Sequence, residues 1–191
     1  SIKSSTSDFL TDSGYKTSEI GFSLGTKFEQ FQNIFLSPEI DFLIEDLETT
    51  SDASNILKKQ EGSYTDLYFN YSINQDLRDK KFRTEDGYVT TFSQELPLVS
   101  DNSEISNAFE ITNYKKLSST SDMVGKVSFF GKTITGLSDD VRISKRLNVP
   151  SYRLRGFERG KIGPVENNDY IGGNYISSLN LSATLPTIVQ G

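Results

Sequence analysis

Apolar and polar residues alternate along most of the chain, which is the pattern of β-strands that have one apolar face. Ile20, Phe22 and Leu24, for example, are separated by Gly21 and Ser23. The pattern predicts about eight strands. They cover residues 1–9, 19–28, 39–45, 66–74, 88–98, 105–114, 123–133 and 175–185. We therefore expect an all-β, antiparallel meander.

The polar face of these strands carries whole charges. They are Glu39, Asp41, Glu45, Asp66, Glu95, Glu110 and Lys126. In a soluble β-sandwich this face would meet water, whereas in a membrane barrel it would line a wet lumen while the apolar face meets lipid. The alternation leaves both folds open, and taken alone it favours the commoner soluble sandwich or small barrel.

The lengths of the connections favour the membrane barrel instead. The linkers are moderate or long at 12–17, 47–62 and 134–172, tight at 29–32 and 116–121, intermediate at 75–86 and short at 100–103. Long loops at one rim and short turns at the other are typical of an outer-membrane barrel, and a loop of about forty residues is unusual in a compact soluble domain. Within the second long linker we expect a short helix over 51–60, capped by Ser51 or Asp52.

Composition narrows the possible chemistry. The 191 residues include no Cys and no His, so disulfides, thiolate nucleophiles and the commonest general base and metal ligand are excluded. A net charge of −6 argues against nucleic-acid binding. A low hydrophobic content of 35%, together with nine Tyr and thirteen Phe, suits strands that are apolar on one face only.

Membrane crossing by a helix is not expected, because no apolar run approaches the roughly 20 residues of a spanning helix. The chain opens with Ser-Ile-Lys-Ser-Ser and shows no charged-then-apolar signal segment. We expect either that a signal was removed or that the chain is an internal fragment.

The long linker between residues 134 and 172 carries the most specific local pattern. Three short motifs follow one another there, with the residues Leu154, Arg155, Gly156 and Phe157, then Ile162, Gly163 and Pro164, then Gly172, Gly173 and Asn174. In this order and spacing they resemble the motifs of the BamA family of outer-membrane assembly factors, also called the bacterial surface antigen family. Leu154 stands where that family usually has Val.

A turn further upstream adds to the resemblance. Residues 75–78 read Gln-Asp-Leu-Arg and precede Asp86, Gly87 and a strand, which is similar to an Asp-x-Arg turn of the same family. The usual Pro of that turn is absent, where Arg83 and Thr84 stand. The resemblance implies that residues 1–191 are one fragment of a larger outer-membrane β-barrel, and that the long loop is its sixth extracellular loop, folded back into the lumen.

The chemistry of the loop residues suits that position. The planar, permanently charged guanidinium of Arg155 suits a partly buried carboxylate pair, and Gly156 lets the backbone turn tightly beside it. The family usually places an acidic partner eight residues after Gly-Gly-Asn, where this chain has Ser182. The partner of Arg155 is therefore expected to be another carboxylate, such as Glu110 or Glu95, or to lie beyond Gly191.

The resemblance implies a function without bond chemistry. The parent protein would fold and insert β-barrel proteins into the bacterial outer membrane, using no cofactor and no metal. Its partners would be unfolded outer-membrane clients, assembly-complex lipoproteins and outer-membrane lipid, with no nucleic acid. The poorly paired edge strands that would template a client lie outside residues 1–191, so we expect that this fragment cannot insert clients alone.

Several alternatives remain. Within the same class they are a two-partner secretion pore or a translocation-assembly relative, and outside it a soluble β-sandwich binding module or a carboxylate-based glycosidase, for which no pair stands out. Arg-Gly-Phe followed by Arg-Gly-Lys also resembles flexible segments that bind RNA or anionic surfaces. The basic cluster from Lys145 to Arg159 would suit lipopolysaccharide phosphates. Whether the strands close into their own barrel or pair edge to edge stays open.

Overall fold

One antiparallel sheet organises the molecule. The computed structural model describes residues 1–9, 14–51, 53–158, 160–166 and 169–184. Within these residues nine strands form a sheet in the order β1-β2-β4-β5-β6-β7-β8-β11, with β3 paired to β4. The bounds are β1 (Ile2–Phe9), β2 (Tyr15–Gly25), β3 (Phe28–Phe31), β4 (Ile34–Thr49), β5 (Gly62–Asp76), β6 (Gly87–Ser100), β7 (Glu104–Lys116), β8 (Val124–Gly136) and β11 (Tyr175–Ala183). The expected meander is confirmed.

The count of eight strands also holds across the sheet, because β2 and β3 act as one interrupted strand. Gly25 pairs with Glu39 and Phe28 with Leu36, so both segments run along β4. The strands β4 and β5 are 16 and 15 residues long, because backbone pairing continues well beyond the segments in which apolar and polar residues alternate regularly. At the other end, β11 stops at Ala183, and Leu185 lies outside the described residues.

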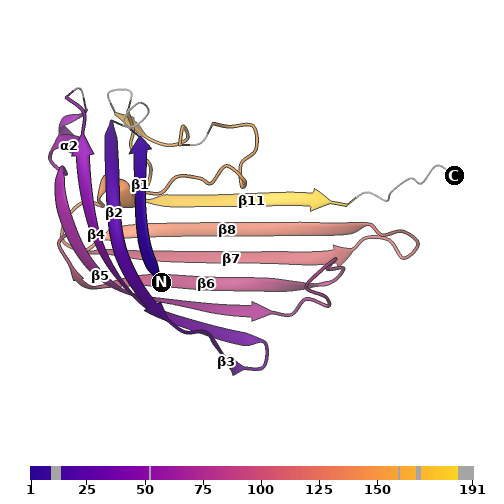
Figure 1. Cartoon of the computed structure of the whole chain (residues 1–191). Helices are drawn as coiled ribbons and strands as arrows, with labels where there is room; N and C mark the ends of the chain where they lie inside the picture. The colour runs from indigo at the N-terminus through magenta and orange to yellow at the C-terminus, as the bar shows by residue number, and fades with distance from the viewer. Residues whose placement is uncertain (10–13, 52, 159, 167–168, 185–191) are drawn as a thin grey trace.

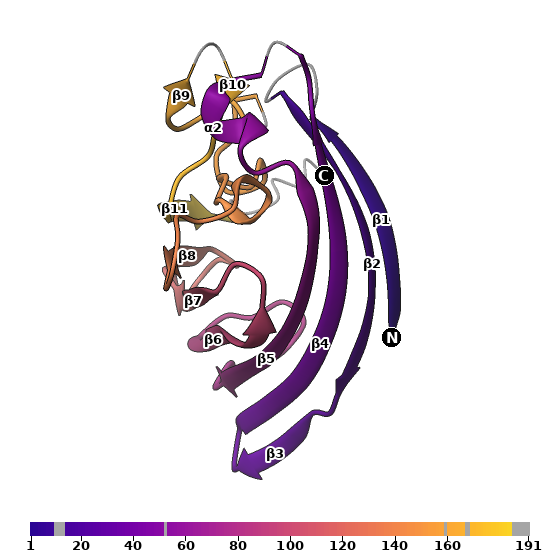
Figure 2. The same cartoon turned by 90° about the vertical axis from the view of Figure 1, so that its left-hand side faces the viewer.

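The sheet curls strongly and does not close. In Figure 1, β1 and β2 run nearly at right angles to β6, β7, β8 and β11, and Figure 2 shows the strands as an arc in cross-section. The edge strands β1 and β11 lie on opposite sides of that arc, and no pairing joins them in the described residues. The segment is therefore an open trough rather than a small barrel of its own.

The apolar side chains cover the convex face. Cross-strand rows place Ile20 beside Ile44 and Phe22 beside Phe42. The opposite parity faces the concave side, where the long loop lies in Figure 2. Exposed apolar residues of the convex face include Ile20, Phe22, Leu24, Ile40, Phe42, Ile44, Phe109, Val127, Phe129, Leu179 and Leu181. Among the described strands no second layer covers this face, so the soluble sandwich is wrong.

Connections of different length separate the two rims. The rim at the start of β7 carries the connection between β4 and β5 and the long loop, whereas the other rim carries 32–33, 77–86 and 117–123. The connection between β4 and β5 contains the helix α2 (Asn55–Lys58). Its N-cap is Ser54, whose hydroxyl accepts a hydrogen bond from the Leu57 N–H at 3.4 Å. The prediction that Ser51 caps this helix is wrong, because the helix begins at Asn55. The other predicted cap, Asp52, lies outside the described residues.

The long loop has local structure that the alternation did not predict. We call residues 137–174 the lumen loop, of which 159, 167 and 168 lie outside the described residues. It contains a 3₁₀ turn, η1 (Ile143–Lys145), and a small hairpin of β9 (Val165–Glu166) and β10 (Asp169–Tyr170). Across the described part of the chain, no helix is long and apolar enough to span a membrane.

The two faces of the wall should respond differently to a charge. Phe42 points to the convex side in the middle of β4, and Ser72 of β5 borders a hollow on the concave side. In a bilayer we expect Phe42→Lys to lower the free energy of unfolding by about 2–4 kcal/mol, the usual cost of a lysine on a lipid-facing strand. The control, Ser72→Lys, should cost far less in the same denaturant titration of the full-length protein in vesicles. An equal cost for both variants would contradict this assignment of the faces.

Candidate functional site

Apolar packing at one rim joins the lumen loop to the wall. In one cluster, Leu47 of β4 and Leu57 of α2, which are 1% and 0% exposed, pack with Ile143 of the loop. In a second cluster, Ile134 of β8 packs with Val141 and Leu147 of the loop. The buried apolar core of this open sheet therefore lies where the loop contacts the strands, and the loop supplies part of it.

A buried ion cluster centres on Arg142, the residue before η1. The Arg142 side chain is fully buried, its Nη2 donates to Asp66 Oδ2, and its Nη1 lies 3.1 Å from Glu45 Oε2. Its Nε lies 3.9 Å from Glu104 Oε1, and the guanidinium carbon lies 4.2 Å from the Tyr64 ring centroid. Three strands, β4, β5 and β7, thus each direct one carboxylate to the same loop residue.

Arg142 keeps its charge because the neighbouring carboxylates offset the effect of its burial. Burial by itself would lower the pKa of Arg142, but the hydrogen bond to Asp66 and the charge of Glu45 raise it above its ordinary value. Lys145 adds a second cation, with its Nζ 5.3 Å from the Tyr68 ring centroid, and the Tyr68 hydroxyl donates to Glu104 at 3.0 Å. A buried carboxylate without such partners would be strongly unfavourable.

A second arginine anchors the loop further along. The Nη2 of Arg153 donates to Glu110 Oε2 at 2.7 Å, and its guanidinium carbon lies 3.8 Å from the Phe130 ring centroid. Glu110 and Phe130 face each other in register on β7 and β8. The Arg153 side chain is only 9% exposed, whereas that of Glu110 is 42% exposed, so the guanidinium is buried against the wall and its partner carboxylate reaches solvent.

The structure brings two of the three loop motifs together. The Pro164 carbonyl accepts from the Ile171 N–H at 3.1 Å, which closes the β9–β10 hairpin between Ile-Gly-Pro and Gly-Gly-Asn. Gly173 exchanges two backbone hydrogen bonds with Leu147, at 2.7 and 2.9 Å, and so ties the end of the loop to its beginning. Gly172 has a φ of +66°, and a Cβ there would lie 3.2 Å from the Leu147 carbonyl, so the turn requires glycine.

The other residues of these two motifs sit around the same hairpin. Ile162 is half-buried, and Gly163 has a φ of +132° close to Gly172. Asn174 accepts through its carbonyl from the Ile134 N–H at 2.9 Å, which links the loop directly to β8. The two motifs therefore build the hairpin and fix the point at which the chain re-enters the sheet.

The Arg-Gly-Phe motif lies apart from this hairpin. Arg155 is exposed and makes no ion pair with any residue that the structure describes, Phe157 is 60% exposed, and Leu154 is half-buried. Gly156 has a φ of +86°, and a Cβ there would meet no atom within 4 Å. Glu110, expected as a partner of Arg155, is held by Arg153 instead. The site of the motif is thus an exposed turn two residues beyond a firm contact with the wall.

The expected lipopolysaccharide site in the basic cluster finds little support. Arg146 binds Asp140 at 2.7 Å and Arg153 binds Glu110, so these guanidinium groups already have partners within the chain. Arg159 lies outside the described residues. Sequence reasoning missed Arg142, Arg153 and Glu104 as anchors. The signal that could have found them is the pair of carboxylates near the loop ends of β4 and β5, Glu45 and Asp66, because buried carboxylates need a nearby cation.

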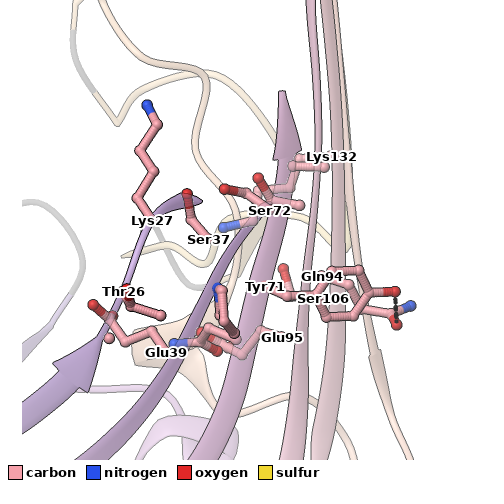
Figure 3. A pocket seen from close by; sticks show the side chains of 15 residues that line it. Thr26, Lys27, Ser37, Glu39, Tyr71, Ser72, Gln94, Glu95, Ser106 and Lys132 are labelled. Carbon is pink, nitrogen blue, oxygen red and sulfur yellow. Dashed lines mark hydrogen bonds between the residues drawn. The ribbon is translucent and has the colours of Figure 1, made fainter. Parts of the chain in front are cut away.

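The concave face also contains a polar hollow of about 550 Å³, lined by strand residues and by the link between β2 and β3. Its lining is rich in short hydroxyl side chains, and Figure 3 shows Lys27, Glu39, Glu95 and Lys132 around it. Glu95, also considered as a partner of Arg155, belongs to this hollow. Within the described residues, no group of acidic side chains is arranged to hold a metal ion.

An apolar convex wall with a loop anchored to its polar concave face defines a class, namely the wall and lumen loop of an outer-membrane β-barrel. The model of the Omp85 superfamily domain matches residues 1–191, and the chain belongs to the Omp85 superfamily. At the level of the family, this indicates the bacterial outer membrane.

A solved structure supports the same fold. The chain is similar to BamA from Haemophilus ducreyi lacking POTRA domains 1–3, with a TM-score of 0.80 and 18% sequence identity. The match covers 93% of this chain and 39% of that chain, so residues 1–191 correspond to less than half of it. No curated protein matched the sequence.

The buried ion cluster should be essential for anchoring the loop. Arg142→Met leaves Glu45, Asp66 and Glu104 without their shared cation, and we expect the free energy of unfolding to fall by about 3–5 kcal/mol. The control, Arg146→Met, breaks a pair whose Asp140 side chain is 63% exposed, and it should cost about 1 kcal/mol or less. Denaturant unfolding of the full-length protein measures both, and similar losses would contradict the central role of Arg142.

Proposed function

We propose that residues 1–191 form part of the wall and the lumen loop of an assembly factor. This factor folds and inserts β-barrel proteins into the bacterial outer membrane. The observation that carries the proposal is the lumen loop, which Arg142 and Arg153 hold against the polar face of a wall whose other face is apolar. Membership of the Omp85 superfamily and the likeness to a BamA barrel support it.

The proposed mechanism makes and breaks no covalent bond and uses no cofactor. A client strand would be templated by β-augmentation at a weakly paired seam, whose edge strands would belong to the parent barrel outside residues 1–191. Local thinning of the bilayer would lower the barrier to insertion. In this scheme the described strands are the rigid side of the barrel, and the loop braces that side from within.

The partners follow from the surfaces. The apolar convex face would contact outer-membrane lipid, and the clients would be unfolded outer-membrane proteins delivered with the help of assembly-complex lipoproteins. Nucleic acid is not a proposed partner, because the net charge is −6 and three arginines of the lumen loop, Arg142, Arg146 and Arg153, are engaged by carboxylates.

The Arg-Gly-Phe motif would complete the barrel from the inside. Arg155 and Phe157 are exposed on the loop, and we propose that they contact strands that complete the wall beyond residues 1–191. A guanidinium in a closed lumen would pair with a carboxylate there. Gly156, with its positive φ, gives the turn that presents both side chains.

Polypeptide translocation, as in a two-partner secretion or translocation-assembly pore, is a second candidate. The polar hollow of about 550 Å³ favours it, because a lining of small hydroxyl groups suits passage of an extended chain. Purified full-length protein in vesicles would separate the two functions. Folding of an added unfolded barrel client into the vesicles supports insertion, whereas transfer of a soluble client into the vesicle interior supports translocation.

The motif arginine provides the mutational test. We expect Arg155→Ala in the full-length protein to slow client insertion by about ten- to a hundredfold, as the loss of a charge-assisted hydrogen bond would do. The barrel itself should stay folded, because Arg155 makes no ion pair with the described wall. Client folding is measured by its shift in gel mobility over time.

Glu158→Gln provides the matched control. Glu158 lies in the same turn, its side chain is 69% exposed, and it pairs with the neighbouring Lys161 at 3.1 Å. We expect insertion by this variant at the parent rate. Normal insertion by Arg155→Ala would refute the role given to the motif.

A further inference from the structure

A second arginine, two residues before the motif, is placed to control where the motif lies. We propose that Arg153 is a positioning residue that fixes the Arg155–Phe157 turn to β7 and β8. The expected effect on client insertion rests on the proposed function, whereas the contacts of Arg153 with the wall do not depend on that function. The loop would then move together with this half of the wall.

The contacts of Arg153 fix the guanidinium in both place and plane. Its hydrogen bond to Glu110 is 2.7 Å long, and its guanidinium carbon is 3.8 Å from the Phe130 ring centroid and 5.1 Å from that of Tyr152. A planar cation held by one carboxylate and one ring face has little rotational freedom. Because Glu110 and Phe130 are register partners on paired strands, their positions are set by the sheet.

Arg153 is also the last firm contact with the wall before the motif. The described residues from Arg155 to Glu158 are exposed, and a Cβ at Gly156 or Gly160 would meet no atom within 4 Å. Two residues of chain span at most about 7 Å. Holding Arg153 therefore confines the backbone of Arg155 to a small volume, which nothing else in the described turn would do.

The Arg142 cluster cannot replace this contact. It holds the loop at η1 through β4, β5 and β7, and eleven positions along the chain separate Arg142 from Arg153. A segment of that length spans more than 30 Å when extended, so an anchor at its start does not determine the position of its end. The two arginines therefore act at separate points, one on the rim and one on the β7–β8 wall.

The proposal has a mechanical consequence for the proposed function. The anchor strands β7 and β8 are neighbours in the sheet, and β11 follows them. If the seam of the parent barrel opens elsewhere, the loop would stay with β7 and β8 and keep Arg155 at a constant height in the lumen. Loss of Arg153 should then affect insertion through the position of the motif and not through the stability of the strands.

A charge exchange between the two partners is the sharpest test. In the full-length protein we would compare Arg153→Glu, Glu110→Arg and the double variant that carries both changes, each with spin labels at Glu158→Cys and Ser119→Cys. Ser119 is an exposed position in the turn between β7 and β8, and residues 1–191 contain no Cys to interfere. Arg146→Ala, which breaks a different loop ion pair, is the matched control.

We expect a narrow distribution of label distances in the parent and in the control. Each single charge reversal should broaden it and lower the rate of client insertion about tenfold, which corresponds to the loss of one such contact. The double variant should restore both readouts, because Glu110→Arg places the cation on the register partner of Phe130 and Arg153→Glu supplies the carboxylate. A merely structural weakening of the barrel would not be rescued by this exchange.

Two results would overturn the inference. One is a narrow distance distribution in Arg153→Glu, because the turn would then be held by other contacts. The other is a double variant that folds, as its heat-dependent gel mobility shows, but keeps the broad distribution. If the parent protein failed to insert clients at all, the proposed function would fall, whereas the distance measurement would still decide the role of Arg153.

Discussion

The contact on which the structure depends is the burial of one loop guanidinium among carboxylates from three strands. Arg142 joins β4, β5 and β7 at the rim where the lumen loop begins, and the two buried apolar clusters of the described residues lie around it. An open sheet of single thickness has no second layer from which to build a core. The loop fills that role on the concave side, and the ion cluster determines where the loop enters.

This arrangement separates two solvents. The convex face requires an apolar surrounding, and the concave face tolerates whole charges because polar groups, the loop and water can satisfy them. Pairs such as Phe22 with Phe42 on one side, and the register of Glu110 with Phe130 on the other, follow from the same two-residue period. The apolar wall and the polar site therefore both follow from the same alternation of apolar and polar residues, which places one on each face of the sheet.

Much of the site was within reach of the sequence, but its key contacts were not. The motifs around Gly163 and Gly172 form turns, and glycine and proline are local signals for turns that need no distant partner. Glu110 was one of the carboxylates expected to bind Arg155, whereas the structure places Arg153 beside it. Arg153 and Arg155 are separated by one residue and have the same side chain and charge. Only the path of the loop decides which of them reaches Glu110.

By itself, the sequence determined the strands, their faces and the positions of the loops, since alternation and turn residues act over a few neighbours. It also predicted the wall of a BamA-type barrel, through the three motifs of the long loop and the turn at residues 75–78. The tertiary structure decided that the sheet stays open, that Ser54 caps α2 and that Arg142 gathers Glu45, Asp66 and Glu104. These features depend on the curvature of the sheet and on contacts between residues far apart in the chain, which no local pattern encodes.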